Sequence, residues 1–166
     1  MIRRLAHLMA MRSLLALAAM VLVACGNGQF GLPLEGVGPF APDQRYTATS
    51  SGFDQPARLV IRDAGAWAAF WNQLYARQSP VPALPAIDFD RQMVLAAAMG
   101  NRNSGGFTIA IDRLSFGSEV LVDVLATSPA RNCAATASLT QPVDAVVVSR
   151  TDAPVRFQES ATVHDC

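Results

Sequence analysis

Residues 93–99 read MVLAAAM, and this apolar run decides which fold the sequence can form. A run of strand length without alternation between apolar and polar residues predicts a strand that is covered on both faces, or one whose small residues press against a helix. Either arrangement needs other elements around the strand. The flanking sequence supplies them.

An amphipathic helix is predicted upstream of this strand. Asp63 is a suitable N-cap residue, and the pattern behind it continues to about Arg77. The apolar side chains at helical spacing are Trp67, Phe70, Trp71, Leu74 and Tyr75. We interpret this stripe as the face of a helix packed on a sheet, with a ligand platform as the alternative. Prolines 80, 82 and 85 then end the helix and carry the chain across in an extended segment.

Further strands are predicted on both sides of the central run. Alternation and β-branched or aromatic composition mark residues 46–49, 58–62, 107–111, 120–125, 143–149 and, as a last short strand, 155–157. The sequence therefore predicts an α+β fold. We expect a mainly antiparallel β-sheet of about five to seven strands with one amphipathic helix packed on it.

The loop that follows the central strand reads GNRNSGG, from Gly100 to Gly106, and has the glycine spacing of a phosphate-binding loop. That motif requires Lys and then Ser or Thr after its second glycine, where this chain has Gly106 and Phe107. A phosphate loop also leads into a helix N-terminus, whereas this loop leads into a strand. We therefore expect no nucleotide binding, and we expect Gly105 and Gly106 to supply the positive φ angles of a hairpin or bulge.

The N-terminus has the pattern of a secretory signal. Three arginines precede an apolar run over residues 14–24, which is too short to span a bilayer as a helix. The run closes on LVAC, which resembles the lipobox of bacterial lipoproteins and makes Cys25 the expected lipidated residue, for example with palmitate. A plain signal peptide or an uncleaved anchor is the alternative. The predicted location is the cell envelope, and the outer membrane if the source is diderm.

The predicted organisation is a signal peptide over 1–24, a Gly/Pro-rich tether over 25–44 and one folded domain over 45–166. Without residues 1–24, ten arginines remain against thirteen acidic residues, a net charge near −3. A weakly acidic chain is a poor nucleic-acid binder, so we expect no such partner. The chain contains no lysine, which excludes Schiff-base chemistry.

Few residues are available for catalysis or metal binding, and we expect neither an enzyme nor a cofactor. After residue 24 there is one histidine, His164, around which any nucleophile and base pair would have to be built. The run His164-Asp165-Cys166 offers metal-ligand types, but zinc requires three or four ligands and no second cluster is present. Asp88 and Asp90 have the spacing of a carboxylate pair on a strand, and turn capping explains Asp88 equally well.

The cysteine count predicts a disulfide. With Cys25 lipidated, Cys133 and Cys166 remain in an oxidising compartment, and an even count there indicates one bond. It would hold the C-terminal tail against the preceding part of the domain. A reactive thiol is the alternative.

Three stretches together resemble a known family. They read IDFDRQMVLAAAMGNRNSGGFTIAI, LVDVLATSPARNC and LTQPVDAVVVSR, and they extend over about residues 87–150. This segment resembles the C-terminal domain of the PrcB family of protease-complex lipoproteins, in which an Asp-Phe, an apolar strand and a glycine loop ending in an aromatic residue occur in this order. Phe107 stands where the family commonly has tyrosine.

The resemblance implies a non-enzymatic lipoprotein that associates with a secreted protease and supports its maturation or stability. Another envelope protein is the alternative partner. The residues expected to contact the partner form the glycine loop: Asn103, Ser104, Gly105, Gly106 and Phe107. A protease inhibitor that presents this loop, with Phe107 as an apolar anchor, is the first alternative. An envelope lipoprotein that binds a small apolar ligand is the second.

Overall fold

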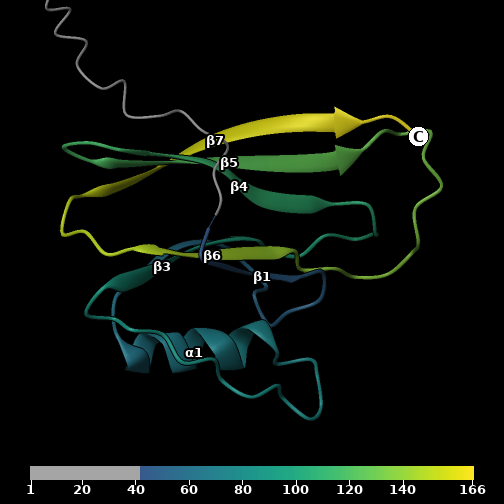
Figure 1. Ribbon diagram of the computed structural model, residues 1–166. Helices are drawn as coiled ribbons and strands as arrows, with labels where there is room; N and C mark the ends of the chain where they lie inside the picture. The colour runs from purple at the N-terminus through teal and green to yellow at the C-terminus, as the bar shows by residue number, and fades with distance from the viewer. Residues whose placement is uncertain (1–41) are drawn as a thin grey trace, which may run out of the picture. The chain divides into compact units, whose positions relative to one another are not determined.

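The computed structural model describes residues 42–166, which fall within one compact unit. The elements, in chain order, are β1 (Gln44–Ala48), β2 (Pro56–Ile61), α1 (Ala64–Leu74), β3 (Gln92–Met99), β4 (Thr108–Phe116), β5 (Val120–Pro129), β6 (Val143–Ser149) and β7 (Val155–His164). Figure 1 shows three layers, with the helix on one side of a four-stranded sheet and a three-stranded sheet on the other. The predicted α+β class is confirmed. No helix within residues 42–166 is long and apolar enough to cross a membrane.

The four-stranded sheet has the order β1-β6-β3-β2 and is antiparallel throughout. Its central strand β3 contains the apolar run of residues 93–99, all of which are buried. Val94, Ala96 and Ala98 belong to the core cluster beneath α1. Met93, Leu95 and Ala97 belong to a second core between the two sheets. Coverage of this strand on both faces, as the missing alternation predicted, is therefore confirmed.

The helix α1 has the predicted apolar face. Asp63 caps it, because its carboxylate accepts a hydrogen bond of 2.8 Å from the amide of Ala66. The buried residues of the helix are Trp67, Phe70, Trp71 and Leu74. Both indoles donate to backbone carbonyls of the proline segment, Trp67 to Pro85 and Trp71 to Pro82, at 2.9 Å each. The aromatic stripe is thus a packed core and not a ligand platform.

The helix is shorter than predicted. It ends at Leu74, and Tyr75 is its C-cap residue. The amide of Tyr75 bonds the carbonyl of Trp71, and the next turns close without continuing the helix. The turn that follows places Arg77 away from the helix, where its guanidinium donates to the Ser51 carbonyl at 2.6 Å.

The second sheet was not predicted as a separate layer. Its order is β4-β5-β7, with β4 and β5 antiparallel and β5 and β7 parallel. The last strand extends over ten residues, although the sequence predicted only 155–157. Residues beyond Phe157 lack apolar alternation, and they form a strand because β5 offers backbone partners as far as Pro129.

The buried carboxylate of Asp144 links the two sheets. Asp144 on β6 is 1% exposed, and its carboxylate accepts two hydrogen bonds from Arg45, at 2.6 and 2.8 Å. It also accepts the amide of Ile111 at 2.6 Å, beside the point where β4 shifts register against β5. The hydrogen bond to Asp144 raises the pKa of Arg45. The hydrogen bond to Ile111 thus holds β4 over the four-stranded sheet.

Candidate partner-binding surface at one end of the sheets

Three segments meet at one end of the molecule, which we call the loop end: residues 100–107, residues 130–142 and the tail residues 164–166. In Figure 1 this end lies on the right, where the chain terminates beside the ends of β5 and β7. The β4–β5 turn lies at the opposite end. The predicted partner-binding residues 103–107 therefore belong to a larger surface that includes the chain after β5.

The glycine loop is bonded along its length to the second loop. Arg102 and Thr140 exchange backbone hydrogen bonds of 2.8 and 2.9 Å as an isolated antiparallel bridge. The amide of Gly105 donates to the carbonyl of Thr136 at 2.9 Å, and the hydroxyl of Thr140 donates to the carbonyl of Ser104 at 2.9 Å. The two loops therefore form one surface with a defined shape.

The expected hairpin at Gly105 and Gly106 is wrong. The loop connects β3 of one sheet to β4 of the other, so its flanking strands do not pair with each other. Gly106 has the predicted positive φ, at +86°, but Gly105 does not. Gly105 is required for a different reason, because a Cβ atom there would collide with the hydroxyl of Thr136. Gly100 also has a positive φ, of +74°, which the sequence did not single out.

The five predicted contact residues differ in their accessibility. Asn103 and Gly106 are exposed, and Ser104 and Gly105 are half-buried. Phe107 is also half-buried, where it packs against the core between the sheets. The guanidinium of Arg102 lies 5.7 Å from the centre of its ring. Among these five residues, Asn103 is thus the one with an exposed side chain, while Phe107 is partly committed to the core.

Gln141 supports the base of the loop end and was not predicted. It is 1% exposed, and its amide donates to the side chain of Asn101 at 2.8 Å. Its backbone bonds both Thr49 and Ser51. The side-chain oxygen of Gln141 has no hydrogen-bond partner among the described residues. The one sequence signal for Gln141 is its position just before an apolar strand. Ordinary turn residues occupy such positions too, so this signal could not identify its role.

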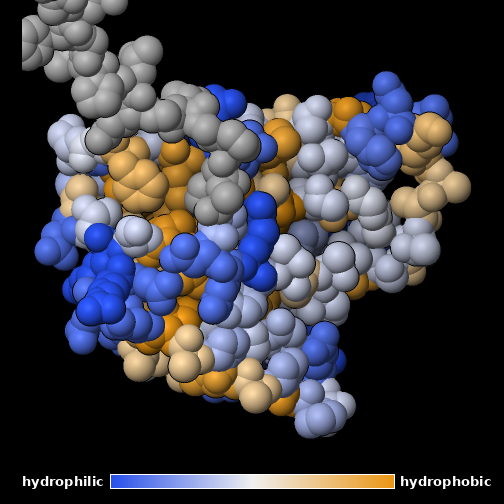
Figure 2. Space-filling view, viewed as in Figure 1, coloured by the Kyte–Doolittle hydropathy of each residue, from blue (hydrophilic) through white to orange (hydrophobic). Residues whose placement is uncertain are grey.

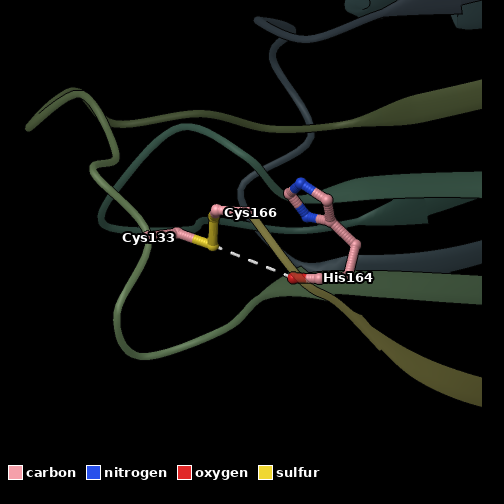
Figure 3. Close-up of a disulfide and its surroundings, with 3 residues drawn as sticks. All are labelled: Cys133, His164 and Cys166. Carbon is pink, nitrogen blue, oxygen red and sulfur yellow. Dashed lines mark hydrogen bonds between the residues drawn. A yellow bond between two sulfur atoms is a disulfide. The ribbon is translucent and has the colours of Figure 1, made fainter.

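The predicted disulfide is present between Cys133 and Cys166, whose Cα atoms lie 5.6 Å apart. It ties the loop after β5 to the tail after β7, as Figure 3 shows. The sulfur of Cys133 also lies 3.8 Å from the carbonyl oxygen of His164. The covalent bond closes a loop of the kind that stabilises a fold by limiting the unfolded chain.

The other candidate sites resolve differently. Asp88 lies in a turn, where its carboxylate accepts the amide of Asp90 at 3.1 Å. Turn capping therefore explains Asp88, as the alternative for this pair anticipated. The metal-ligand run is only partly assembled, because His164 and Cys166 lie with Cys133 in one group that does not include Asp165. Cys25 lies outside the described residues.

A separate apolar cleft lies between α1 and the edge strand β2. It has a volume of about 360 Å³ and is lined by apolar residues that include Phe53, Leu59 and Phe70. The one polar lining side chain, Gln73, already donates to the carbonyl of Gly52. Ligand sites usually combine an apolar lining with several free polar groups, so this cleft lacks the features of a specific site.

The surface of the loop end is mixed in character. Figure 2 shows mostly pale colours of intermediate hydropathy there, with hydrophilic and weakly hydrophobic residues at the tip. Leu139 in the second loop and Val163 near the tail are large apolar residues with exposed fractions of 57% and 60%. Exposed apolar groups within a polar surround are typical of surfaces that bind other proteins reversibly.

The comparison with protein families confirms the resemblance. A family model described as PrcB C-terminal matches residues 93–149, from the start of the buried run of β3 to the end of β6. This part of the chain is therefore similar to the PrcB C-terminal domain, and the match includes the glycine loop and the loop that bonds it. No match to the chain was found among curated proteins or among solved structures.

Proposed function

We propose that this protein is a membrane-anchored accessory subunit that binds a secreted or envelope protease through the loop end and supports its maturation or stability. The observation that carries the proposal is the PrcB C-terminal match over residues 93–149. That segment contains both loops of the proposed surface together with the strands that hold them. The family resemblance suggests association with a protease, and the loop end is the surface that we propose for this contact.

The hydrogen bonds of the glycine loop favour a subunit over an inhibitor. An inhibitor that mimics substrate offers its loop backbone to the strands of an enzyme cleft. Here the backbone groups of Arg102, Ser104 and Gly105 already bond the second loop. The exposed side chain of Asn103 remains available to contact a partner. A non-catalytic role also fits the described residues, in which His164 lies with two bonded cysteines.

Site-directed photo-crosslinking tests the surface in the native cell. A photoreactive amino acid would replace Asn103, which is exposed at the loop end, or Ser118, which is exposed in the turn at the opposite end. We expect crosslinks to a protease from position 103 and none from position 118. Equal crosslinking at the two positions, or crosslinking from 103 only to proteins without protease activity, would reject the proposal.

A cleavage assay then distinguishes subunit from inhibitor. The purified full chain is added to a separate, uncrosslinked preparation of the protease that crosslinking identified. Both the initial rate of peptide cleavage and the decay of that rate over time are followed. A subunit leaves the initial rate unchanged or raises it, and it slows the decay. A concentration-dependent loss of the initial rate would instead establish the inhibitor.

Side-chain truncation at the loop separates binding from folding. Ser104→Ala should leave the melting temperature unchanged, because the structure uses only the backbone of Ser104. Phe107→Ala should cost about 1 to 2 kcal/mol of unfolding free energy, less than a fully buried aromatic would, since Phe107 is half-buried. Thermal unfolding is measured alongside crosslinking from position 103. A loss of about 3 kcal/mol or more would place Phe107 entirely in the core and remove it from the contact surface.

Membrane anchoring through Cys25 is part of the proposal and has its own test. Cells expressing the protein or Cys25→Ala are grown with radioactive palmitate, and the label on the protein is measured. We expect label only on the protein with the unaltered sequence. The Cys25→Ala variant should either be released from the membrane fraction or remain there with its signal peptide uncleaved. Label that persists in Cys25→Ala would refute lipidation at this residue.

A further inference from the structure

Three side chains with metal-binding atoms converge at the loop end. They are Cys133, after β5, and His164 and Cys166, at the end of β7. Their two sulfur atoms and an imidazole nitrogen all lie within 4.8 Å of one another. Figure 3 shows the three residues together, with the disulfide next to the His164 backbone. In the sequence this group was invisible as a set, because Cys133 is 31 positions from His164.

Backbone bonds that do not depend on the disulfide hold the loop of Cys133 beside His164. The parallel ladder of β5 and β7 places Pro129 opposite His164. The amide of Ala130 then donates to the carbonyl of His164 at 3.1 Å. The amide of Cys133 donates to the carbonyl of Ala130 at 3.0 Å and so folds the loop back toward the tail. Cys133 would therefore stay near His164 after the disulfide is broken, and Cys166 follows His164 by two residues.

We propose that reduction of this disulfide creates a zinc site formed by the thiolates of Cys133 and Cys166 and the imidazole of His164. Two thiolates on a tetrahedral zinc ion lie about 3.8 Å apart, given Zn–S bonds of about 2.3 Å. The ligand atoms are within 4.8 Å already, so small side-chain movements complete the arrangement. Water would fill the fourth position. This proposal does not rest on the proposed protease association, because it concerns only residues of this chain.

The chemistry of the switch requires a dithiol reductant, the class of compound that exchanges with exposed disulfides in the envelope. The dithiol attacks one sulfur, forms a mixed disulfide and leaves as its own disulfide, so two electrons and two protons pass to Cys133 and Cys166. Each thiol then releases its proton when its sulfur binds zinc. Cys166 is exposed and Cys133 is half-buried, so a reductant can reach the bond.

The loop end would therefore have two alternative cross-links, the disulfide and the zinc ion. The disulfide connects the loop of residues 130–142 to the tail covalently, and zinc would restore that connection in the reduced protein. Because this loop also bonds the glycine loop through Thr136 and Thr140, either cross-link would preserve the shape of the surface. Reduction without zinc would leave only the backbone hydrogen bonds to hold the loop.

The test uses the full-length lipoprotein, extracted in detergent, in oxidised and reduced forms. Zinc is titrated against a chromophoric chelator, and cobalt is added separately because thiolate ligands give it a charge-transfer absorption. We expect one zinc per reduced chain, a cobalt–thiolate band, and neither signal from the oxidised protein. His164→Gln should weaken zinc binding by about tenfold or more, whereas the adjacent Asp165→Asn should bind as the unaltered protein does.

Several outcomes would overturn the proposal. They are equal zinc binding by oxidised and reduced protein, no binding by the reduced protein, and equal affinity of His164→Gln and Asp165→Asn. Circular dichroism accompanies each titration, so that a reduced protein that unfolds is recognised. If it unfolds, recovery of the folded spectrum on addition of zinc supports the proposal, and failure to recover it contradicts it.

Discussion

The central sheet and the loop end are stabilised in opposite ways. In the sheet, β3 and β6 are buried on both faces, and the side chains of two cores carry the stability. At the loop end most side chains are exposed, and the shape depends on backbone hydrogen bonds, two glycines and one disulfide. This difference shows that the residues that stabilise the fold and the residues that are accessible at its surface lie in different parts of the molecule. The rigid layers hold the loops, while exposed loop side chains such as Asn103 and Leu139 remain accessible to a partner.

The largest effect is expected from truncation of the helix core. Trp67→Ala should lower the unfolding free energy by about 3 to 5 kcal/mol, because Trp67 is 2% exposed and packs against other aromatic rings. The matched change at the loop end, Leu139→Ala, should alter it by less than about 0.5 kcal/mol, since that side chain is mostly exposed. Denaturant unfolding measures both. Similar losses would break the contrast between the two regions.

Removal of the disulfide comes next and acts on the loop end itself. Replacing both cysteines by serine should cost about 3 to 4 kcal/mol in the chain-entropy model, for a sequence separation of 33. The unaltered protein should resist alkylation at Cys133 and Cys166 until a reductant is added. Unchanged stability in the double variant would show that the backbone bonds alone hold the loop end.

Loss of the Asp144 carboxylate, which links the two sheets, should have a somewhat smaller effect. Asp144→Ala should cost about 2 to 3 kcal/mol, because it leaves the Ile111 amide without its acceptor while Arg45 keeps partial access to solvent. Asp144→Asn retains an acceptor and should cost less. Thermal unfolding of the two variants provides the comparison. Equal losses would mean that the charge of Asp144, and not its hydrogen bond to Ile111, holds β4 in place.

The smallest effects are expected at the two glycines of the loop, and they differ in cause. Gly106→Ala should cost about 1 to 2 kcal/mol, because an alanine is strained at its positive φ. The loss of stability caused by Gly105→Ala should be reduced by a second change, Thr136→Ala, which removes the hydroxyl that the new Cβ would meet. The same second change should not relieve Gly106→Ala. Rescue of both glycine variants, or of neither, would contradict the two separate roles.

The sequence predicted the elements whose signals are local. The unalternated run of residues 93–99 predicted a strand covered on both faces, and the spacing of Trp67, Phe70 and Trp71 predicted the helix face. The count of cysteines predicted the bond between Cys133 and Cys166, on the expectation that Cys25 is lipidated and that the other two lie in an oxidising compartment. These predictions succeeded because each depends on neighbouring residues or on composition, which no distant contact could override.

Only the tertiary structure decided how those elements combine. The division into two sheets, the length of β7 and the role of Gly105 all depend on partners more than twenty-five positions away in the chain. The same holds for the ion pair of Arg45 with Asp144 and for the meeting of His164 with Cys133. Residues 93–149 and their flanks thus determined by themselves that a layered α+β domain would form. Long-range backbone pairing determined which side chains share its loop end. The sequence of one strand does not specify which distant strand pairs with it, because strand preference depends on the tertiary context.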